Sequence, residues 1–291
     1  SPLLANGKVY IGLSSFNDHP CVRGAVIALD PATGAHLWEH YFVPAGELGG
    51  AVWSSVTADP ATSTLLVATG NPCSPPADQP VQGGISDDQQ DAIVGLNWDT
   101  GALRWYYTAI GNDDCDCDFG EGPVSYVFHG QRYVVAGNKL GVVYAVTPPA
   151  SGSSAPLAWS DTIASIGPAP GGGIFTPPAY KDGLVYVAGG PSLDNVCHTG
   201  ALWALRADSG AVAWRQCTAG EIVGAPSITG NVIFAGQANS VVAYDATTGQ
   251  VLWQQQTPGE VWGGVNISQG NVLVVTTAGK LWCFRLRQAP K

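Results

Sequence analysis

Four aspartates stand within six residues at positions 113–118, where the sequence reads Asp-Asp-Cys-Asp-Cys-Asp. Carboxylates this close together repel one another unless water or a bound cation screens their charge. Oxygen donors of this kind suit Ca²⁺ and similar hard cations. The segment therefore predicts a cation site, and a solvent-exposed acidic loop is the alternative interpretation.

Other chemistries have less support in the sequence. The five histidines show no HxxH spacing, which disfavours a histidine zinc site, and no Gly-x-Ser-x-Gly turn supports a hydrolase. Lys and Arg number 12 against 22 Asp and Glu, and they form no basic cluster. Nucleic acid and anionic membrane surfaces are therefore not expected partners, and no apolar run approaches the length of a membrane span.

Seven cysteines in this chain predict an oxidising compartment, so the protein is expected to be secreted, extracellular or periplasmic. Cys197 and Cys217 bracket one repeat and could close it with a disulfide. Cys115 and Cys117 are one residue apart, which is expected to be too close for them to pair with each other. Each of these two should therefore bond a distant cysteine, such as Cys21 or Cys73. The odd count leaves at least one thiol free or paired outside this chain.

The elements that must position these residues form a repeat. Four segments share a Thr-Gly or Ser-Gly turn that is followed, four residues after the glycine, by a tryptophan. These tryptophans are Trp38, Trp105, Trp214 and Trp253. A fifth copy has a longer turn and ends at Trp159, and a sixth begins at residues 279–284.

Each turn follows a strand-like alternation, as in residues 25–29 and 240–244, and a second such run precedes it, as in residues 7–12. The polar turn residues can bond their own backbone while glycine takes a positive φ. A single sheet of this kind cannot bury its own face, so neighbouring sheets must stack, with a tryptophan at one fixed place in each. The sequence predicts an all-β fold, a β-propeller of four-stranded antiparallel blades with about six blades visible in one domain, 1–291. A β-sandwich is disfavoured because it would not repeat residues at fixed offsets.

Together these segments resemble the tryptophan-docking repeats of the β-propellers that bind pyrroloquinoline quinone (PQQ). That family includes quinoprotein alcohol dehydrogenases, polyvinyl-alcohol dehydrogenases, which this chain resembles most, and a non-enzymatic outer-membrane assembly lipoprotein. Catalytic members have eight blades, so the resemblance implies either that N-terminal blades precede this chain or that six blades close by themselves. The chain begins with Ser1 and has no methionine, which indicates a processed product or a piece of a longer chain.

The resemblance also implies site roles, through four motifs that occur in the family's order. Trp53 matches the tryptophan on which the quinone ring stacks, and Asn71 matches a ligand of the catalytic metal. Asp116 matches the catalytic base and a metal ligand, and Asp118 matches an extra metal-binding carboxylate of lanthanide-using relatives. Lys139 matches the cation that contacts the quinone oxygens.

A further metal ligand, a glutamate in the family, is expected just before residue 22, where this chain offers Asp18 or His19 instead. The implied cofactors are PQQ and Ca²⁺ or a lanthanide, and the implied partners are an alcohol and an external electron acceptor such as a cytochrome c. In this chemistry the metal polarises the quinone, a carboxylate takes the alcohol proton as hydride leaves carbon, and Lys139 stabilises the charge on the reduced quinone.

Each residue also has a plainer interpretation. Trp53 could be one more packing residue of the propeller, Asn71 could only shape a turn before Pro72, and Lys139 could be a solvated surface lysine. The corresponding alternative function is a non-catalytic extracellular propeller that serves as a protein-binding or structural scaffold. A protein partner could then complete or bind the propeller.

Overall fold

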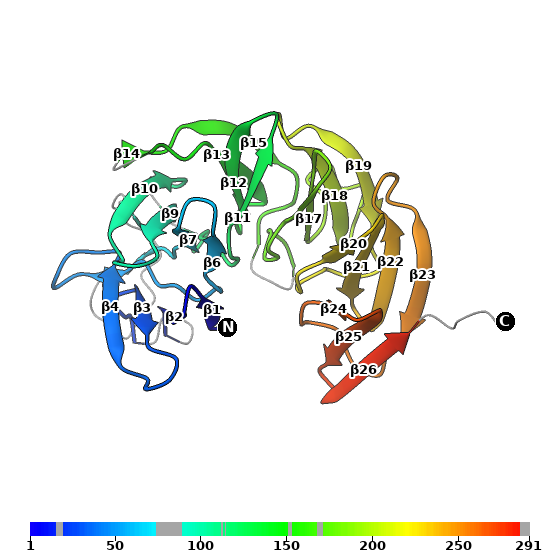
Figure 1. Ribbon diagram of the computed structural model, residues 1–291. Coiled ribbons are helices and arrows are strands. Elements are labelled where there is room, and N and C mark those ends of the chain that lie inside the picture. Colours follow the sequence, from blue (N-terminus) through cyan, green and yellow to red (C-terminus); the bar gives the residue numbers. More distant parts are fainter. Residues whose placement is uncertain are drawn as a thin grey trace.

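The computed structural model describes residues 1–15, 20–73, 89–111, 113, 115–150, 153–167 and 171–285. Its regular structure consists of β-strands, and the described residues form no helix. Six sheets follow one another along an arc, from the first sheet at one end to the sixth at the other (Figure 1). The all-β propeller architecture predicted from the repeat is therefore confirmed.

The sheets follow the sequence in order. The first sheet holds β1 (Leu3–Ala5), β2 (Lys8–Leu13), β3 (Ala25–Leu29) and β4 (His36–Tyr41). The second holds β6 (Thr57–Asp59), β7 (Thr64–Ala68), β9 (Ala92–Asn97) and β10 (Leu103–Thr108), and β14 (Ser153–Ser154) pairs in parallel with β10 at its edge. The third holds β11 (Val124–Phe128), β12 (Gln131–Gly137), β13 (Val142–Val146) and β15 (Leu157–Thr162).

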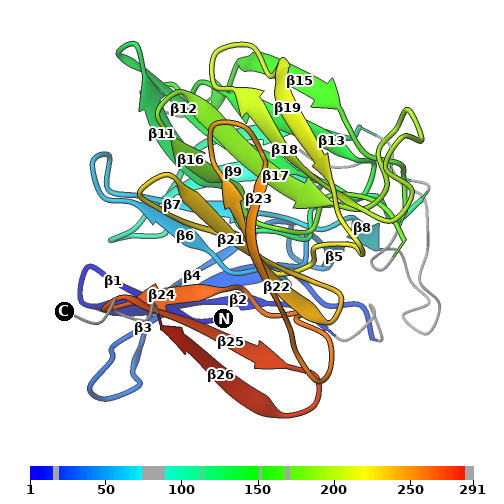
Figure 2. The same ribbon diagram turned by 90° about the vertical axis from the view of Figure 1, so that its right-hand side faces the viewer.

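The fourth sheet holds β16 (Ala179–Lys181), β17 (Leu184–Gly189), β18 (Ala201–Arg206) and β19 (Val212–Cys217). The fifth holds β20 (Ser227–Thr229), β21 (Val232–Gln237), β22 (Ser240–Asp245) and β23 (Val251–Gln256). The sixth has three described strands, β24 (Asn266–Ser268), β25 (Asn271–Thr276) and β26 (Lys280–Arg285). A separate pair joins β5 (Leu48–Gly49) to β8 (Pro72–Cys73). Figure 2 brings the fifth and sixth sheets to the front and shows β26 at the edge of the molecule.

The predicted turns have the expected local chemistry. In the first repeat the Asp30 Oδ1 atom accepts hydrogen bonds from the backbone N–H groups of Ala32 and Thr33, at 2.9 and 2.8 Å, and Gly34 has φ 72°. These hydrogen bonds lower the pKa of Asp30. In the fifth sheet, Asp245 binds the backbone of the equivalent turn in the same way. Local side-chain bonding therefore sets the hairpin geometry, as the sequence indicates.

The tryptophan of one sheet packs on the turn glycine of the next. A Cβ atom added to Gly101 would lie 2.5 Å from the Trp38 ring, and one added to Gly210 would lie 2.5 Å from the Trp159 ring. The Trp159 Nε1–H also donates to the backbone oxygen of Ala207 at 3.0 Å. Only a residue without a side chain fits under the ring, which explains why the glycine and the tryptophan recur together.

The hydrophobic core lies between successive sheets. One buried cluster joins the first two sheets, and four further clusters join each later sheet to its neighbour. Burying an aliphatic side chain of this kind contributes roughly 1.5–3 kcal/mol, so each sheet is stabilised mainly by the next one. The two end sheets share no strand pairing among the described residues, and Figure 1 shows an open arc.

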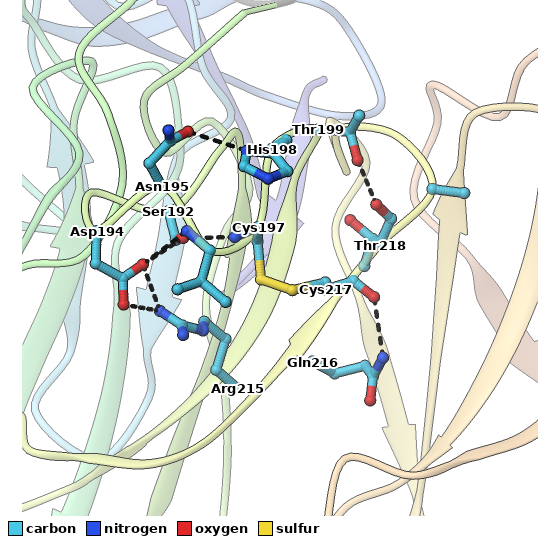
Figure 3. Close-up of a disulfide and its surroundings, with 12 residues drawn as sticks. Ser192, Asp194, Asn195, Cys197, His198, Thr199, Arg215, Gln216, Cys217 and Thr218 are labelled. Carbon is cyan, nitrogen blue, oxygen red and sulfur yellow. Dashed lines mark hydrogen bonds and ion pairs between the residues drawn. A yellow bond between two sulfur atoms is a disulfide. The ribbon is translucent and has the colours of Figure 1, made fainter.

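The predicted disulfide between Cys197 and Cys217 is present and closes the fourth repeat (Figure 3). An ion pair also joins the loop before Cys197 to β19, the strand that contains Cys217. In this pair, Arg215 Nη1 lies 2.8 and 2.7 Å from the two carboxylate oxygens of Asp194. The Ser192 hydroxyl accepts the Cys197 N–H at 2.9 Å and donates to Asp194 Oδ1 at 2.7 Å. These contacts fasten a loop of the fourth sheet to β19.

Replacing Cys197 and Cys217 together by serine is expected to lower the free energy of unfolding by about 3 kcal/mol, because the bridge closes a loop of about 20 residues in the unfolded chain. Urea unfolding followed by tryptophan fluorescence measures the loss. The matched control is Cys283→Ser, since Cys283 is the free, exposed cysteine and should change little. Equal stability of both variants would show that the bridge contributes nothing.

Candidate functional site

Three loops bring the predicted site residues together. Asp118 lies in the loop before β11, Lys139 lies just after β12, and Trp53 lies between β5 and β6. The Lys139 backbone N–H donates to the Asp118 carbonyl oxygen at 3.1 Å, which fixes two of the loops to each other. Residues that are far apart in the sequence thus converge on one place, which we call the Lys139 cluster: Trp53, Asp116, Asp118 and Lys139.

Asp118 is the buried carboxylate of this cluster, with a relative exposure of 2%. Its Oδ2 atom accepts the Trp53 Nε1–H at 2.8 Å, and its Oδ1 atom lies 2.5 Å from the Lys139 Nζ atom. Burial raises the pKa of Asp118 to about 6, although the nearby Lys139 ammonium acts in the opposite direction. A carboxylate that is ionised at neutral pH but has a raised pKa is well matched to accepting a proton.

Lys139 is a buried cation between two carboxylates, because its Nζ atom also lies 2.7 Å from Asp116 Oδ1. Burial lowers the pKa of the ammonium, but the attraction of Asp118 and the hydrogen bonds to both aspartates outweigh it and raise the pKa overall. The ammonium also lies 5.1 Å from the centroid of the Trp53 ring, within the range of a cation–π contact. The interpretation of Lys139 as a solvated surface lysine does not match this environment.

Trp53 is 42% exposed, whereas the repeat tryptophans Trp38, Trp105 and Trp159 are 3–9% exposed. Another repeat tryptophan, Trp253, lies next to the last described sheet and is similarly open, at 37%. The Trp53 ring centroid lies 6.5 Å from that of Phe175, and Gly120 fits between the two rings. A Cβ atom at Gly120 would lie 2.5 Å from Trp53 Cη2 and 2.7 Å from Phe175 Cδ1. The result is a partly open aromatic surface beside a cation and a carboxylate.

The structure corrects the expectation for Cys115 and Cys117, which pair with each other, with their Cα atoms 5.2 Å apart. Two features of the turn bring them together. Asp116 between them has φ 54°, and the Asp113 carboxylate accepts the backbone N–H groups of both cysteines at 2.9 Å. Cys21 and Cys73, the distant partners proposed for them, are instead bonded to each other.

The turn between Cys115 and Cys117 also determines where the Asp116 side chain lies. This side chain is 38% exposed, and one of its oxygens contacts Lys139. The sulfur atoms beside it lie close to the Asp113 carboxylate, but the disulfide leaves no thiolate to bind a metal. Asp116 therefore lies at the rim of the cluster, and Asp118 lies inside it.

Asn71 lies close to this site. The preceding residue, Gly70, has no side chain, and this lets the backbone next to Asn71 approach Asp118. A Cβ atom at Gly70 would lie 2.9 Å from Asp118 Oδ2. The Asn71 side-chain nitrogen donates to the Pro72 carbonyl at 3.3 Å, which leaves the amide oxygen as a possible ligand. Asp18, the other predicted ligand, lies outside the described residues.

A cation bound by both Asp116 and Asp118 does not fit the described arrangement. Their oxygens are suitable donors for a hard cation, but the Lys139 ammonium already lies between them and neutralises charge there. A metal held through Asn71 and Asp18 is a separate arrangement, and it stays a prediction.

Glu121 is a buried carboxyl group that the sequence interpretation missed. It is 1% exposed, and its Oε1 atom accepts the backbone N–H of Gly137, two residues before Lys139. Burial raises the pKa of Glu121 well above its ordinary value, and the Gly137 hydrogen bond offsets this only in part. Its one sequence signal is its position three residues after Asp118, between two glycines.

The burial of Glu121 predicts that the free energy of unfolding falls as the pH rises. Folded Glu121 keeps its proton above pH 4.5, whereas the unfolded chain releases it, so the folded state binds more protons and loses stability with increasing pH. The raised pKa of Asp118 likewise makes the free energy of unfolding fall as the pH rises from about 4 to 6. Glu121→Gln should flatten the dependence measured by urea unfolding from pH 5 to 8. The exposed Glu47→Gln is the control, and an unchanged slope in Glu121→Gln would contradict the prediction.

Comparison with known proteins identifies the family. Residues 1–147 match the family model described as the β-propeller domain of glucose, ethanol and alcohol dehydrogenases. Residues 139–289 match the model described as outer membrane protein assembly factor BamB. The chain belongs to the PQQ-type β-propeller family. Each model covers about half of the chain, so the match extends over nearly all of the repeats.

Individual relatives agree with this family. A polyvinylalcohol dehydrogenase of Sphingopyxis sp. strain 113P3 is 28% identical over 72% of this chain, which corresponds to 37% of that enzyme. The chain thus spans little more than a third of the length of this relative. Two solved structures share the fold. The quinohemoprotein alcohol dehydrogenase of Comamonas testosteroni has a TM-score of 0.71 and 22% identity, over 94% of this chain and 55% of that one. A europium-containing methanol dehydrogenase has a TM-score of 0.72 and 18% identity, over 97% of this chain and 64% of that one.

No described segment forms a helix that is long and apolar enough to cross a membrane.

Proposed function

We propose that this chain carries the quinone-binding part of a PQQ-dependent alcohol dehydrogenase of the polyvinyl-alcohol type. The observation that carries the proposal is the Lys139 cluster, in which an open tryptophan face lies beside a buried cation and a buried carboxylate. The similarity to polyvinylalcohol dehydrogenase supports the substrate class, an alcohol such as polyvinyl alcohol. The electron acceptor would be external, such as a cytochrome c, and the compartment extracellular or periplasmic.

The described residues fit a planar quinone better than they fit a metal. Trp53 offers a partly exposed ring for stacking, and Lys139 offers donors to the oxygens of a flat anionic ligand. When bound, PQQ would supply an acceptor for the hydride of the alcohol carbon. Asp118 would accept the hydroxyl proton, since it is buried, oriented by the Trp53 Nε1–H and close to its pKa at neutral pH. This assignment differs from the sequence prediction, in which Asp116 is the base.

In this scheme Lys139 has two tasks. Its ammonium holds Asp118 in the ionised form, and it would stabilise negative charge that develops beside Trp53. Asp116 would hold Lys139 in place from the exposed side. Binding of Ca²⁺ or a lanthanide through Asn71 and Asp18 stays a prediction, because Lys139 lies between the other two predicted ligands, Asp116 and Asp118. No step above depends on it.

Titration with PQQ tests this proposal. We expect PQQ to quench the fluorescence of the partly exposed Trp53, in the presence of Ca²⁺ or a light lanthanide, and the Trp53→Phe variant to lose that quenching component. A full-length protein that contains this chain should then oxidise alcohols with an artificial dye as acceptor. Absence of both quenching and dye reduction in the full-length protein would reject the dehydrogenase function.

The second candidate is a non-catalytic propeller that serves as a protein-binding scaffold. It is favoured by one specific observation, the match of residues 139–289 to the assembly-factor model. A scaffold should fail to bind PQQ at all, so the same titration separates the two candidates.

A further inference from the structure

A cavity of about 330 Å³ lies between the second and third sheets, away from the Lys139 cluster. Arg104 on β10 and Arg132 on β12 lie in its wall. Arg132 and Lys139 are seven positions apart, and most of the intervening residues belong to the extended strand β12, so the cavity and the Lys139 cluster lie on the order of 20 Å apart. None of the predicted site residues lines the cavity.

The two arginines have different partners. The Arg132 Nη1 atom lies 2.6 Å from Asp59 Oδ2, and the Asp59 side chain is 5% exposed, so this guanidinium is neutralised by a buried carboxylate. Arg104 has no carboxylate partner among the described residues. Its Nη1 atom donates to two neutral oxygens, the Thr62 carbonyl and the Thr64 hydroxyl. The wall of the cavity therefore carries one unbalanced positive charge, in a chain whose formal net charge is −10.

Several other residues that line the cavity are apolar. Leu66, Trp105 and Val134 are almost completely buried by their own packing, so the apolar surface that a ligand could contact is mainly that of Pro148, Pro149 and Ala150. Sites for small molecules typically combine such apolar walls with a few polar groups, and their volumes run from about 300 to 1,000 Å³. This cavity lies at the small end of that range, so a ligand must be correspondingly small.

We propose that this cavity binds a small organic carboxylate, with its carboxylate on Arg104 and its apolar body against Pro148 and Pro149. A guanidinium offers donors in a planar fork that matches a carboxylate, and the described bonds of Arg104 engage only one of its nitrogens. One unbalanced positive charge favours a monoanion over a phosphate dianion. The site is independent of the proposed quinone chemistry, so either can fail without the other.

Calorimetric titration of the protein with 3-phenylpropanoate tests the site. We expect saturable binding with one site per chain, and at least about tenfold weaker binding of the uncharged 3-phenylpropanol, because a charged hydrogen bond is lost. Inorganic phosphate alone should not compete. Equal binding of the alcohol, competition by phosphate, or no saturable binding at millimolar concentrations would overturn the proposal.

Variants keep the test specific. Arg104→Gln should weaken 3-phenylpropanoate binding at least about tenfold, whereas the exposed Arg206→Gln, which removes the same charge elsewhere, should not change it. Because Arg104→Gln could also disturb folding, Ala150→Trp provides a second variant. Ala150 is exposed at the rim of the cavity, so a large ring there should block entry without altering the core. Undiminished binding in both Arg104→Gln and Ala150→Trp would reject this location.

Discussion

Asp118→Asn is expected to lower PQQ-dependent alcohol oxidation by about 10²–10⁴-fold, the range for loss of a general base, whereas Asp116→Asn should retain activity within about tenfold. The difference follows from their surroundings. Asp118 is buried and oriented from both sides by Trp53 and Lys139, while Asp116 is 38% exposed and forms an ion pair with the lysine. Turnover with an artificial dye in the full-length protein measures both variants.

Three measurements make this comparison decisive. Circular dichroism checks that each variant folds, and quenching of Trp53 by PQQ checks that the cofactor still binds. The pH profile should then lose, in Asp118→Asn, the ionisation near pH 6 that its raised pKa predicts. The reverse ranking, with Asp116→Asn inactive and Asp118→Asn active, would restore the sequence prediction that Asp116 is the base.

The fold could be predicted because its determinants are local. A turn such as the one at Asp30 and Gly34 is specified by its own side chains, and the tryptophan four residues later lies on the next turn glycine. The same spacing recurs along the chain, so neighbouring sheets must make the same contact. The strands expected at residues 25–29 and 240–244 are β3 and most of β22.

The site was predictable only in outline. Motif order indicated that Trp53, Asp118 and Lys139 belong together, but not which carboxylate would be buried. That depends on the turn at Asp116, where a positive φ and the hydrogen bonds of Asp113 determine the direction of each side chain. The same turn joins Cys115 to Cys117, which spacing alone disfavoured.

Contacts between sheets are still harder to predict from the sequence. The Asp59–Arg132 ion pair joins residues 73 positions apart, and nothing in either local sequence predicts it. Glu121 lies in a glycine-rich segment that is typical of a loop, yet the packing of that loop excludes water from it. The burial of ionisable groups in this protein is therefore set by how the sheets and loops meet, and only the three-dimensional arrangement reveals it.

Gly24→Ala is expected to destabilise the protein by about 3 kcal/mol or more, because overpacking costs most where the obstructing atoms are backbone. A Cβ atom at Gly24 would lie 1.8 Å from the Gly50 carbonyl oxygen, and the Gly24 N–H already donates to Gly49 at 2.9 Å. The displaced backbone leads directly to Trp53, so PQQ quenching should fall as well. Gly263→Ala, where an added Cβ has no neighbour within 4 Å, is the matched control in urea unfolding. If the two variants differ by less than about 1 kcal/mol, the backbone at residues 49–51 can move aside, and the position of Trp53 does not depend on this contact.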